Sequence, residues 1–140
     1  MLRQDNSLIR MAKHLAQRHN CKVIYTGQFA GKYTGVETVV DAGIEEFLSY
    51  ILHAKYIITN SFHGTVFSLL FGKQFVNVKI DSTSSRAENL LDIVGLSDKM
   101  IASYGQLDVI DTPYDVDSVN EKLQEIRTDS LKYISDLAIV

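Results

Sequence analysis

The spacing of apolar residues predicts helices separated by short strands. The first helix is indicated by four apolar residues at the spacing i, i+3, i+4 and i+7: Leu8, Met11, Ala12 and Leu15. Further apolar stripes predict helices over residues 44–52, 62–71, 87–94 and 116–134. The helix over 62–71 also carries small residues suited to close packing, namely Ser61, Thr65, Ser68 and Gly72. Runs of β-branched and aromatic residues predict strands over residues 22–26, 36–40, 56–59 and 75–78.

The order of these elements predicts one α/β domain over residues 1–140. Strands that alternate with helices across short links form βαβ units and pair in parallel. Residues 56–59 form a continuous apolar run, as expected for a strand buried on both faces. Right-handed crossovers place helices on both faces, so we expect a Rossmann-like parallel sheet. The only proline, Pro113, lies in the one candidate linker, residues 97–114.

Composition narrows the classes of protein that remain. With 46% hydrophobic and 22% charged residues, the chain has ordinary globular usage, which argues against disorder. A net charge of −3 argues against nucleic acid as a partner, because that would need a basic surface. No apolar run is long enough to span a membrane, and the start lacks the apolar core of a signal peptide. The lone Cys21 cannot form an internal disulfide, so we expect a soluble, cytoplasmic protein.

The link between the strand 56–59 and the next helix is the first candidate site. In open parallel sheets, ligands bind where the carboxyl ends of strands lead into helix N-termini. Asn60 or Ser61 is expected to cap a helix whose first turn carries His63, the only titratable residue of that helix. Unpaired backbone N–H groups beside a histidine suit an anion and acid–base chemistry. The alternative is a histidine that only hydrogen-bonds a neighbouring carbonyl group.

The segment after the strand 75–78 is the second candidate site. Ser85 and Glu88 match a capping box, which predicts that a helix begins here. Arg86 then lies in the first turn, where the helix dipole disfavours a cation. An anion held between Arg86, the serine hydroxyls and free N–H groups would reverse that penalty. The alternative is an Arg86 that pairs with an acid such as Asp81 or is simply solvated.

The other polar residues give weaker signals. Three histidines on or beside predicted helices lack metal-ligand spacing, and solvated or capping roles are expected for them: His14, His19 and His53. Three glycines do not form the G-x-G-x-x-G fingerprint of dinucleotide-binding proteins: Gly27, Gly31 and Gly35. The sequence therefore predicts neither a metal site nor a bound cofactor.

Residues 54–75, AKYIITNSFHGTVFSLLFGKQF, closely resemble the polysaccharide pyruvyl transferase family. The resemblance continues through Ser85-Arg86, Leu90-Leu91 and Val94-Gly95-Leu96, in the same order and at the same spacing. Its core is a buried strand that ends in Thr-Asp/Asn-Ser-Phe-His-Gly, then an apolar helix, a glycine turn and another strand. Asn60 stands where the family commonly has Asp.

The resemblance implies a reaction in which phosphoenolpyruvate gives its carboxyvinyl carbon to two hydroxyls of a sugar, forming a pyruvate ketal and inorganic phosphate. His63 is then expected to be the catalytic acid/base or to bind the donor. One anionic end of the donor would lie at the substrate-binding residues Asn60, Ser61, Phe62, Gly64 and Thr65, and another at Ser85 and Arg86. Phosphoenolpyruvate is the donor substrate, and no cofactor is expected.

Family members are longer, so the chain resembles only the carboxyl-terminal, donor-binding half of a two-domain, GT-B-like enzyme. An amino-terminal domain would complete the cleft and hold much of the acceptor, a glycan or lipid-linked sugar used in bacterial exopolysaccharide biosynthesis. We therefore expect the isolated 140 residues to be inactive alone and prone to self-association. The expected location is the cytoplasm or the inner face of the membrane.

Two other readings stay open. A glycosyltransferase of similar fold would take a nucleotide sugar at the same helix N-termini, so fold alone does not separate it from a pyruvyl transferase. A binding or regulatory remnant would keep the fold and lack donor affinity.

Overall fold

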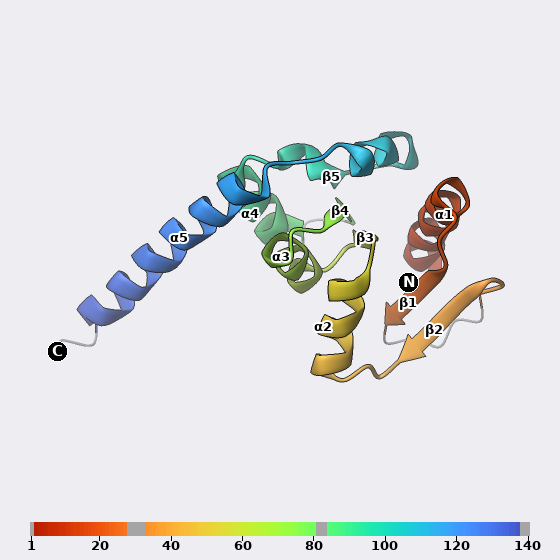
Figure 1. Cartoon of the computed structure of the whole chain (residues 1–140), viewed down its shortest axis with the longest axis horizontal. Coiled ribbons are helices and arrows are strands. Elements are labelled where there is room, and N and C mark those ends of the chain that lie inside the picture. The colour runs from red at the N-terminus through yellow and green to blue at the C-terminus, as the bar shows by residue number, and fades with distance from the viewer. Residues whose placement is uncertain (1, 28–32, 81–83, 138–140) are drawn as a thin grey trace.

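The computed structural model describes residues 2–27, 33–80 and 84–137, with side chains from residue 7 onward (Figure 1). Its elements in chain order are α1 (Leu2–His19), β1 (Val23–Gly27), β2 (Val36–Val40), α2 (Ile44–His53), β3 (Tyr56–Thr59), α3 (Phe62–Leu70), β4 (Gln74–Val78), α4 (Ser85–Val94), the 3₁₀ segment η2 (Ser97–Lys99), β5 (Met100–Ile101), the 3₁₀ segment η3 (Tyr104–Asp111) and α5 (Val116–Leu137). Every helix and strand predicted from the sequence is present.

The strands pair in parallel, as predicted, but they form two small sheets. β1 pairs with β2, and β3, β4 and β5 form a second sheet in that order. β1 and β3 are not paired with each other. The ring of His19, just before β1, packs on that of Tyr56 at the start of β3, with 4.5 Å between centroids. The chain is thus an α/β protein with parallel pairing, and one continuous sheet was a wrong expectation.

Helices cover both faces of the β3–β4–β5 sheet, as the crossover rule predicts. Alternate residues of β4 enter two separate clusters. Val76 and Val78 pack with residues of α1, β5 and η3. Phe75 points the other way and packs with residues of α3, α4 and α5. The sheet edge at the carboxyl ends of β3 and β4 is therefore framed by α3 and α4, which follow those strands.

α3 packs on the sheet through small residues and Leu69 rather than through its aromatic ones. Thr65, Ser68 and Leu69 are buried, whereas Leu70 is 52% exposed. Phe67 instead contacts Phe47 of α2, with ring centroids 6.4 Å apart. The helix ends at Leu70, and Gly72 just beyond it has a φ of +59°, which lets the N–H of Lys73 donate to the Ser68 carbonyl at 2.8 Å.

The predicted linker over residues 97–114 is part of the core, which is a correction. It contains β5 and η3, and Ile101, Leu107 and Ile110 are buried. Lys99 is 1% exposed, and its ammonium donates to the carbonyls of Val109 at 2.8 Å and Thr112 at 2.6 Å. β5 has only two residues, so its sequence carried no strand signal.

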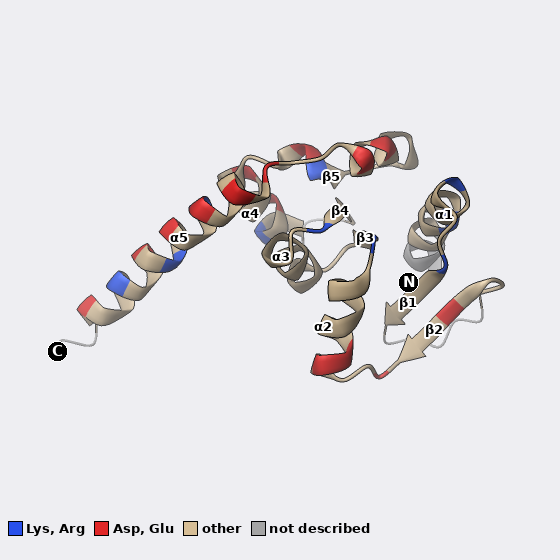
Figure 2. Cartoon of the chain, viewed as in Figure 1, with Lys and Arg blue, Asp and Glu red and all other residues tan. Residues whose placement is uncertain are grey.

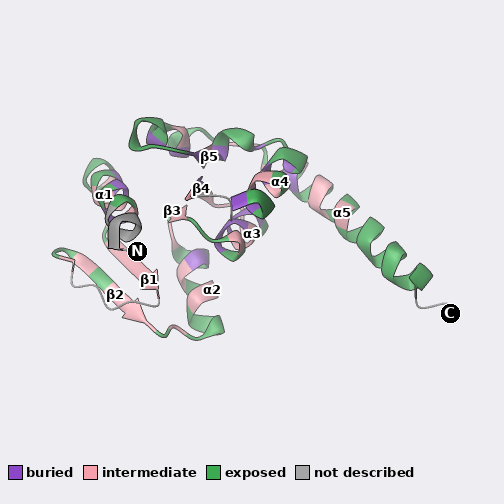
Figure 3. Ribbon diagram, turned by 180° about the vertical axis from the view of Figure 1, so that it is seen from behind, coloured by how far each residue is buried: buried purple, intermediate pink, exposed green. Residues whose placement is uncertain are grey.

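α5 extends away from the rest of the structure (Figures 1 and 3). Val119 is buried near its start, but its far half exposes the large apolar side chains of Leu131, Tyr133, Ile134 and Leu137. Acidic and basic residues are distributed along its length (Figure 2), and most of them are exposed. The amphipathic pattern thus predicted the helix correctly, but only its first turns pack on the sheet.

Candidate anion-binding site

The turn between β3 and α3 holds its polar groups in a defined arrangement. Ser61 is the N-cap, and its hydroxyl accepts a hydrogen bond from the Gly64 N–H at 3.4 Å. The Ser61 N–H donates to the Thr59 hydroxyl at 3.0 Å. The N–H groups of Phe62 and His63 come before the first intrahelical hydrogen bond and point toward the positive end of the helix dipole. Of the two predicted caps, Ser61 is the one used.

Gly64 allows α3 to start close to the end of β3. A β-carbon at this position would overlap the Thr59 hydroxyl, so a side chain here would displace the turn. Thr65 lies one position further, with its hydroxyl fully buried and its N–H bonded to the Ser61 carbonyl at 3.1 Å. Of the predicted donor-binding residues, Thr65 therefore lies beneath the turn, whereas Asn60 and Ser61 lie at its surface.

His63 is exposed in the first turn of α3, next to Phe62, with ring centroids 5.8 Å apart. Among the described residues, its imidazole makes no side-chain hydrogen bond or ion pair. The alternative of a histidine occupied by a neighbouring carbonyl group thus has no support within that part of the chain. The imidazole is available to a ligand at the helix N-terminus.

Arg86 joins the two segments that the sequence singled out separately. Its guanidinium lies over the ring of Phe62, with 5.1 Å between the guanidinium carbon and the ring centroid. β3 and β4 are neighbours in the sheet, so the turns that follow them meet at one edge. Within the described ranges Arg86 has no acidic partner, and Asp81, proposed as its alternative partner, lies outside them.

The predicted capping box of Ser85 and Glu88 is wrong. Ser84 is the N-cap, with φ −77° and ψ −5°, and it makes no side-chain cap. Its hydroxyl instead accepts from the Ile80 N–H at 3.3 Å. The carboxylate of Glu88 forms an ion pair with Lys79 at the end of β4, a stronger partner than a backbone N–H. Ser85 remains exposed in the first turn of α4, beside Arg86.

A polar groove lies on the other flank of α4 and was not predicted from the sequence. Its lining residues come from α4, from the carboxyl ends of β4 and β5, and from η2 and η3: Lys79, Glu88, Asn89, Asp92, Ser97, Met100, Ile101, Ala102 and Gln106. The groove does not include Arg86 among its lining residues. Its two carboxylates outnumber its one ammonium, which makes it a poor place for an anionic donor.

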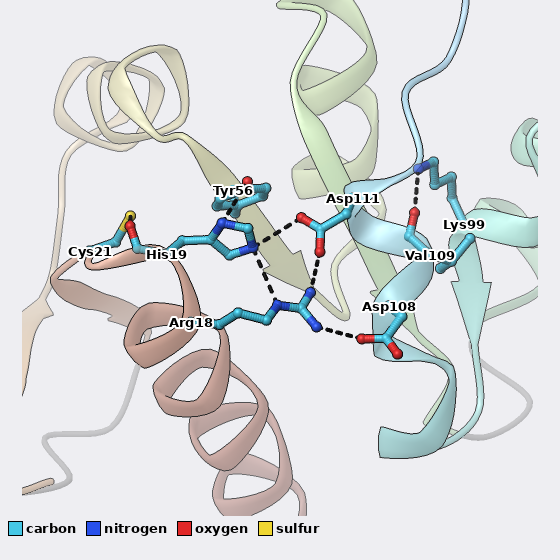
Figure 4. Close-up of polar contacts among 8 residues, drawn as sticks. All are labelled: Arg18, His19, Cys21, Tyr56, Lys99, Asp108, Val109 and Asp111. Atoms are coloured by element: carbon cyan, nitrogen blue, oxygen red, sulfur yellow. Dashed lines mark hydrogen bonds and ion pairs between the residues drawn. The ribbon is translucent and has the colours of Figure 1, made fainter.

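A second polar cluster lies at the opposite, amino-terminal end of β3 (Figure 4). Arg18 forms ion pairs with Asp108 and Asp111 of η3. His19 lies 3.0 Å from the Asp111 carboxylate and 3.2 Å from the Tyr56 hydroxyl. Burial, followed by the negative charge of Asp111, raises the pKa of Tyr56. His19 was expected to be solvated or capping, but these contacts fasten α1 to η3; no local sequence signal pairs residues so far apart.

The other two histidines behave more nearly as expected. His53 is exposed, and its ring lies 2.8 Å from the Ser49 carbonyl of the same helix. His14 is exposed and makes an edge contact with the Tyr104 ring at 5.2 Å between centroids. The described residues contain no group of three His, Cys, Asp or Glu side chains placed to hold a metal ion. No helix in the described ranges is long and apolar enough to cross a membrane.

Comparison with known proteins confirms the resemblance. The family model for polysaccharide pyruvyl transferase matches residues 5–82, more than half of the chain. The match includes the whole of the β3–α3 turn and ends before Ser85. No curated protein and no solved structure matches the chain, so the resemblance to half of a GT-B-like enzyme stays an expectation. On the family match, the chain belongs to the polysaccharide pyruvyl transferase family.

Proposed function

We propose that this chain binds phosphoenolpyruvate for a transferase that builds a pyruvate ketal on two hydroxyl groups of a sugar. One observation carries the proposal: the Arg86 guanidinium lies against Phe62, beside the exposed His63 at the start of α3. This arrangement places a cation, an imidazole and free N–H groups at one sheet edge, in a chain of the pyruvyl transferase family.

The charges at this edge suit the donor. Phosphoenolpyruvate carries a phosphate and a carboxylate, so it needs at least two groups of donors. The first-turn N–H groups of α3 would hold one anionic group, because they lack intrahelical acceptors and lie at the positive end of the dipole. Arg86, with Ser85 beside it, would hold the other by charge-assisted hydrogen bonds.

His63 fits the role of general acid. In the proposed reaction, the first sugar hydroxyl forms a bond to C2 of the donor, while C3 takes up a proton and becomes a methyl group. The proton of that hydroxyl passes to a base. The second hydroxyl then displaces phosphate from C2 and loses its own proton, which completes the ketal. His63 has no other side-chain hydrogen-bond partner among the described residues, so its imidazolium is free to deliver the proton to C3.

We further propose that a second domain faces this edge and holds the sugar acceptor. His63 and Arg86 are both exposed, so a donor bound here would remain in contact with water. A facing domain that closes over this edge, holding a glycan or lipid-linked sugar, would exclude that water and supply the base. We place the reaction in the cytoplasm or at the inner membrane face, because phosphoenolpyruvate is a cytoplasmic metabolite.

Titration of the chain with phosphoenolpyruvate, followed by amide NMR, tests the proposal. Saturable shifts are expected at residues 60–65 and 85–86. His63→Ala and Arg86→Ala should each raise the dissociation constant about tenfold, the loss expected for one charge-assisted contact. His53→Ala and Arg10→Ala are matched controls, since they remove an exposed histidine and an exposed arginine outside the site.

The other readings predict different results. A nucleotide-sugar enzyme would respond to a nucleoside diphosphate at these residues and not to phosphoenolpyruvate. A remnant would show no saturable shift with either ligand. A lack of response in the chain, followed by binding in a longer protein that includes the facing domain, would show that this edge is incomplete alone.

A further inference from the structure

A chain of buried hydrogen bonds links β4 to the turn that carries His63. Asn77 of β4 is 1% exposed, and its amide nitrogen donates to the Thr65 hydroxyl at 2.7 Å. Thr65 is fully buried, and its hydroxyl donates a hydrogen bond to the Ser61 carbonyl at 3.1 Å. Ser61 is the N-cap of α3. A strand side chain is therefore connected, through one hydroxyl, to the residue that caps the helix.

Stability alone does not explain an asparagine at position 77. Its neighbours along β4 are Phe75, Val76 and Val78, all buried and apolar. The side-chain oxygen of Asn77 is buried and has no hydrogen-bond partner among the residues that the structure describes. A buried carbonyl oxygen without a donor destabilises a fold, and replacing both members of a buried polar pair by apolar groups of similar shape can be neutral or stabilising. Apolar residues at positions 77 and 65 would therefore suit this core at least as well.

The link connects the two elements that hold the site. His63 follows β3, whereas Arg86 lies on α4, the helix after β4. The contact of Arg86 with Phe62 depends on where α3 begins relative to β4. The hydrogen bond from Asn77 to Thr65 fixes the start of α3 relative to β4, because the Thr65 hydroxyl also bonds the carbonyl of the N-cap residue Ser61.

We propose that Asn77 and Thr65 are positioning residues, which hold the start of α3 so that His63 and Arg86 face one donor molecule. Neither side chain touches the ligand, since both are buried. The proposal rests on the function proposed above, and it explains why an incompletely bonded amide lies in an apolar strand.

The test compares variants that remove the link with one that removes a similar buried hydroxyl. The double variant, Asn77→Val with Thr65→Val, removes both hydrogen-bonding side chains. The single variant Thr65→Val removes only the hydroxyl and keeps the shape of the side chain. Thr65→Ser keeps the hydroxyl. Ser68→Ala is the control, because Ser68 is equally buried in α3 but its hydroxyl donates within that helix, to the Gly64 carbonyl at 2.7 Å. Thermal unfolding, amide NMR of the free protein and phosphoenolpyruvate titration are measured for each.

We expect the double variant to unfold at or above the temperature of the parent chain, yet to bind phosphoenolpyruvate about tenfold more weakly. The amide signals of residues 61–64 and the ring signals of His63 should shift without ligand. Thr65→Ser should restore affinity, and Ser68→Ala should leave it unchanged.

Three results would overturn the positioning role. The first is unchanged affinity and unchanged signals in a stable double variant. The second is an equal loss of affinity in Ser68→Ala. The third is a fall in stability that accounts for the weaker binding. In that case, the loss of affinity in Thr65→Val and Thr65→Ser follows the loss of stability of each variant. If neither the parent chain nor a longer protein with the facing domain binds phosphoenolpyruvate, the proposed function fails, but the signals of the free protein still decide whether the link positions the turn.

Discussion

An arginine and a histidine are found at each end of the β3–β4–β5 sheet, but their surroundings differ. At the amino end, Arg18 and His19 contact the carboxylates of Asp108 and Asp111. At the carboxyl end, Arg86 and His63 each contact the ring of Phe62, and no described acid pairs with them. The first pair is held by carboxylates and links α1 to η3. The second pair makes no ion pair with the described residues.

The difference teaches that residue type alone does not define a site here. Ion pairs among four side chains of α1 and η3 act as structural contacts, because each charge already has a partner. The anion binding that we propose for the carboxyl-end pair depends on the helix N-terminus beside it and on the absence of an acid among the described neighbours. The predictions below test whether mutation can change stability at the amino end without changing anion affinity at the carboxyl end, and whether adding or removing acids makes one end behave like the other.

The largest effect is expected for Lys99→Ala, which acts on the η3 side of the sheet. The variant leaves a cavity and removes the donor for the Val109 and Thr112 carbonyls. The free energy of unfolding should fall by about 3 kcal/mol, measured by urea denaturation. Lys132→Ala, in the exposed part of α5, is the control. The affinity of the folded protein for phosphoenolpyruvate should not change. A parallel loss of this affinity would show that the amino and carboxyl ends of the sheet are coupled.

Arg86→Glu places an acid at the carboxyl end, as at the amino end. The dissociation constant for phosphoenolpyruvate should rise roughly thirtyfold, about 2 kcal/mol, because a cation is lost and an anion repels the donor. Stability should change by less than about 0.5 kcal/mol, since Arg86 is exposed. Arg10→Glu controls for net charge. Isothermal titration calorimetry gives the affinity, and an unchanged value would remove Arg86 from the site.

The sequence predicted the elements well and their assembly only in part. Apolar spacing located the helices and strands, and the rule that ligands bind at the carboxyl ends of strands pointed to both His63 and Arg86. The contact of Arg86 with Phe62 depends on two loops meeting in space, which no local pattern encodes. The same holds for Arg18 and Asp108, which lie 90 positions apart. η3 and β5 were missed because their order comes from burial of residues such as Lys99, not from periodicity.

Removing the acids at the amino end should make it resemble the carboxyl end. In Asp108→Asn with Asp111→Asn, Arg18 and His19 lose their anionic partners. Stability should fall only slightly, because exposed ion pairs contribute little, and the loss should shrink at high salt. NMR titration with inorganic phosphate should then show weak binding at Arg18 and His19. If no shifts occur there, the helix N-terminus, and not the unpaired side chains, decides anion binding at the other end.

The smallest effect concerns Tyr114, which lies between η3 and α5. Its hydroxyl donates to the Lys73 carbonyl at 2.9 Å, and burial raises its pKa to about 12. An unfolded tyrosine ionises near pH 10, so the unfolded state releases this proton first as the pH rises. The stabilising contribution of the Tyr114 hydroxyl is therefore complete below pH 10 and is lost between pH 10 and about 12.

Tyr114→Phe cannot ionise at this position, and it also lacks the hydrogen bond to Lys73. At pH 8 we expect the variant to be less stable than the parent by about 1 kcal/mol, measured by urea denaturation. Between pH 10 and 11.5 this difference should narrow, because only the parent loses the contribution of Tyr114. Other groups with shifted pKa values, Tyr56 and Lys99 among them, occur in both proteins and cancel in the difference. Parallel stability curves across this range would mean that the Tyr114 hydroxyl ionises as readily in the folded chain as in the unfolded one.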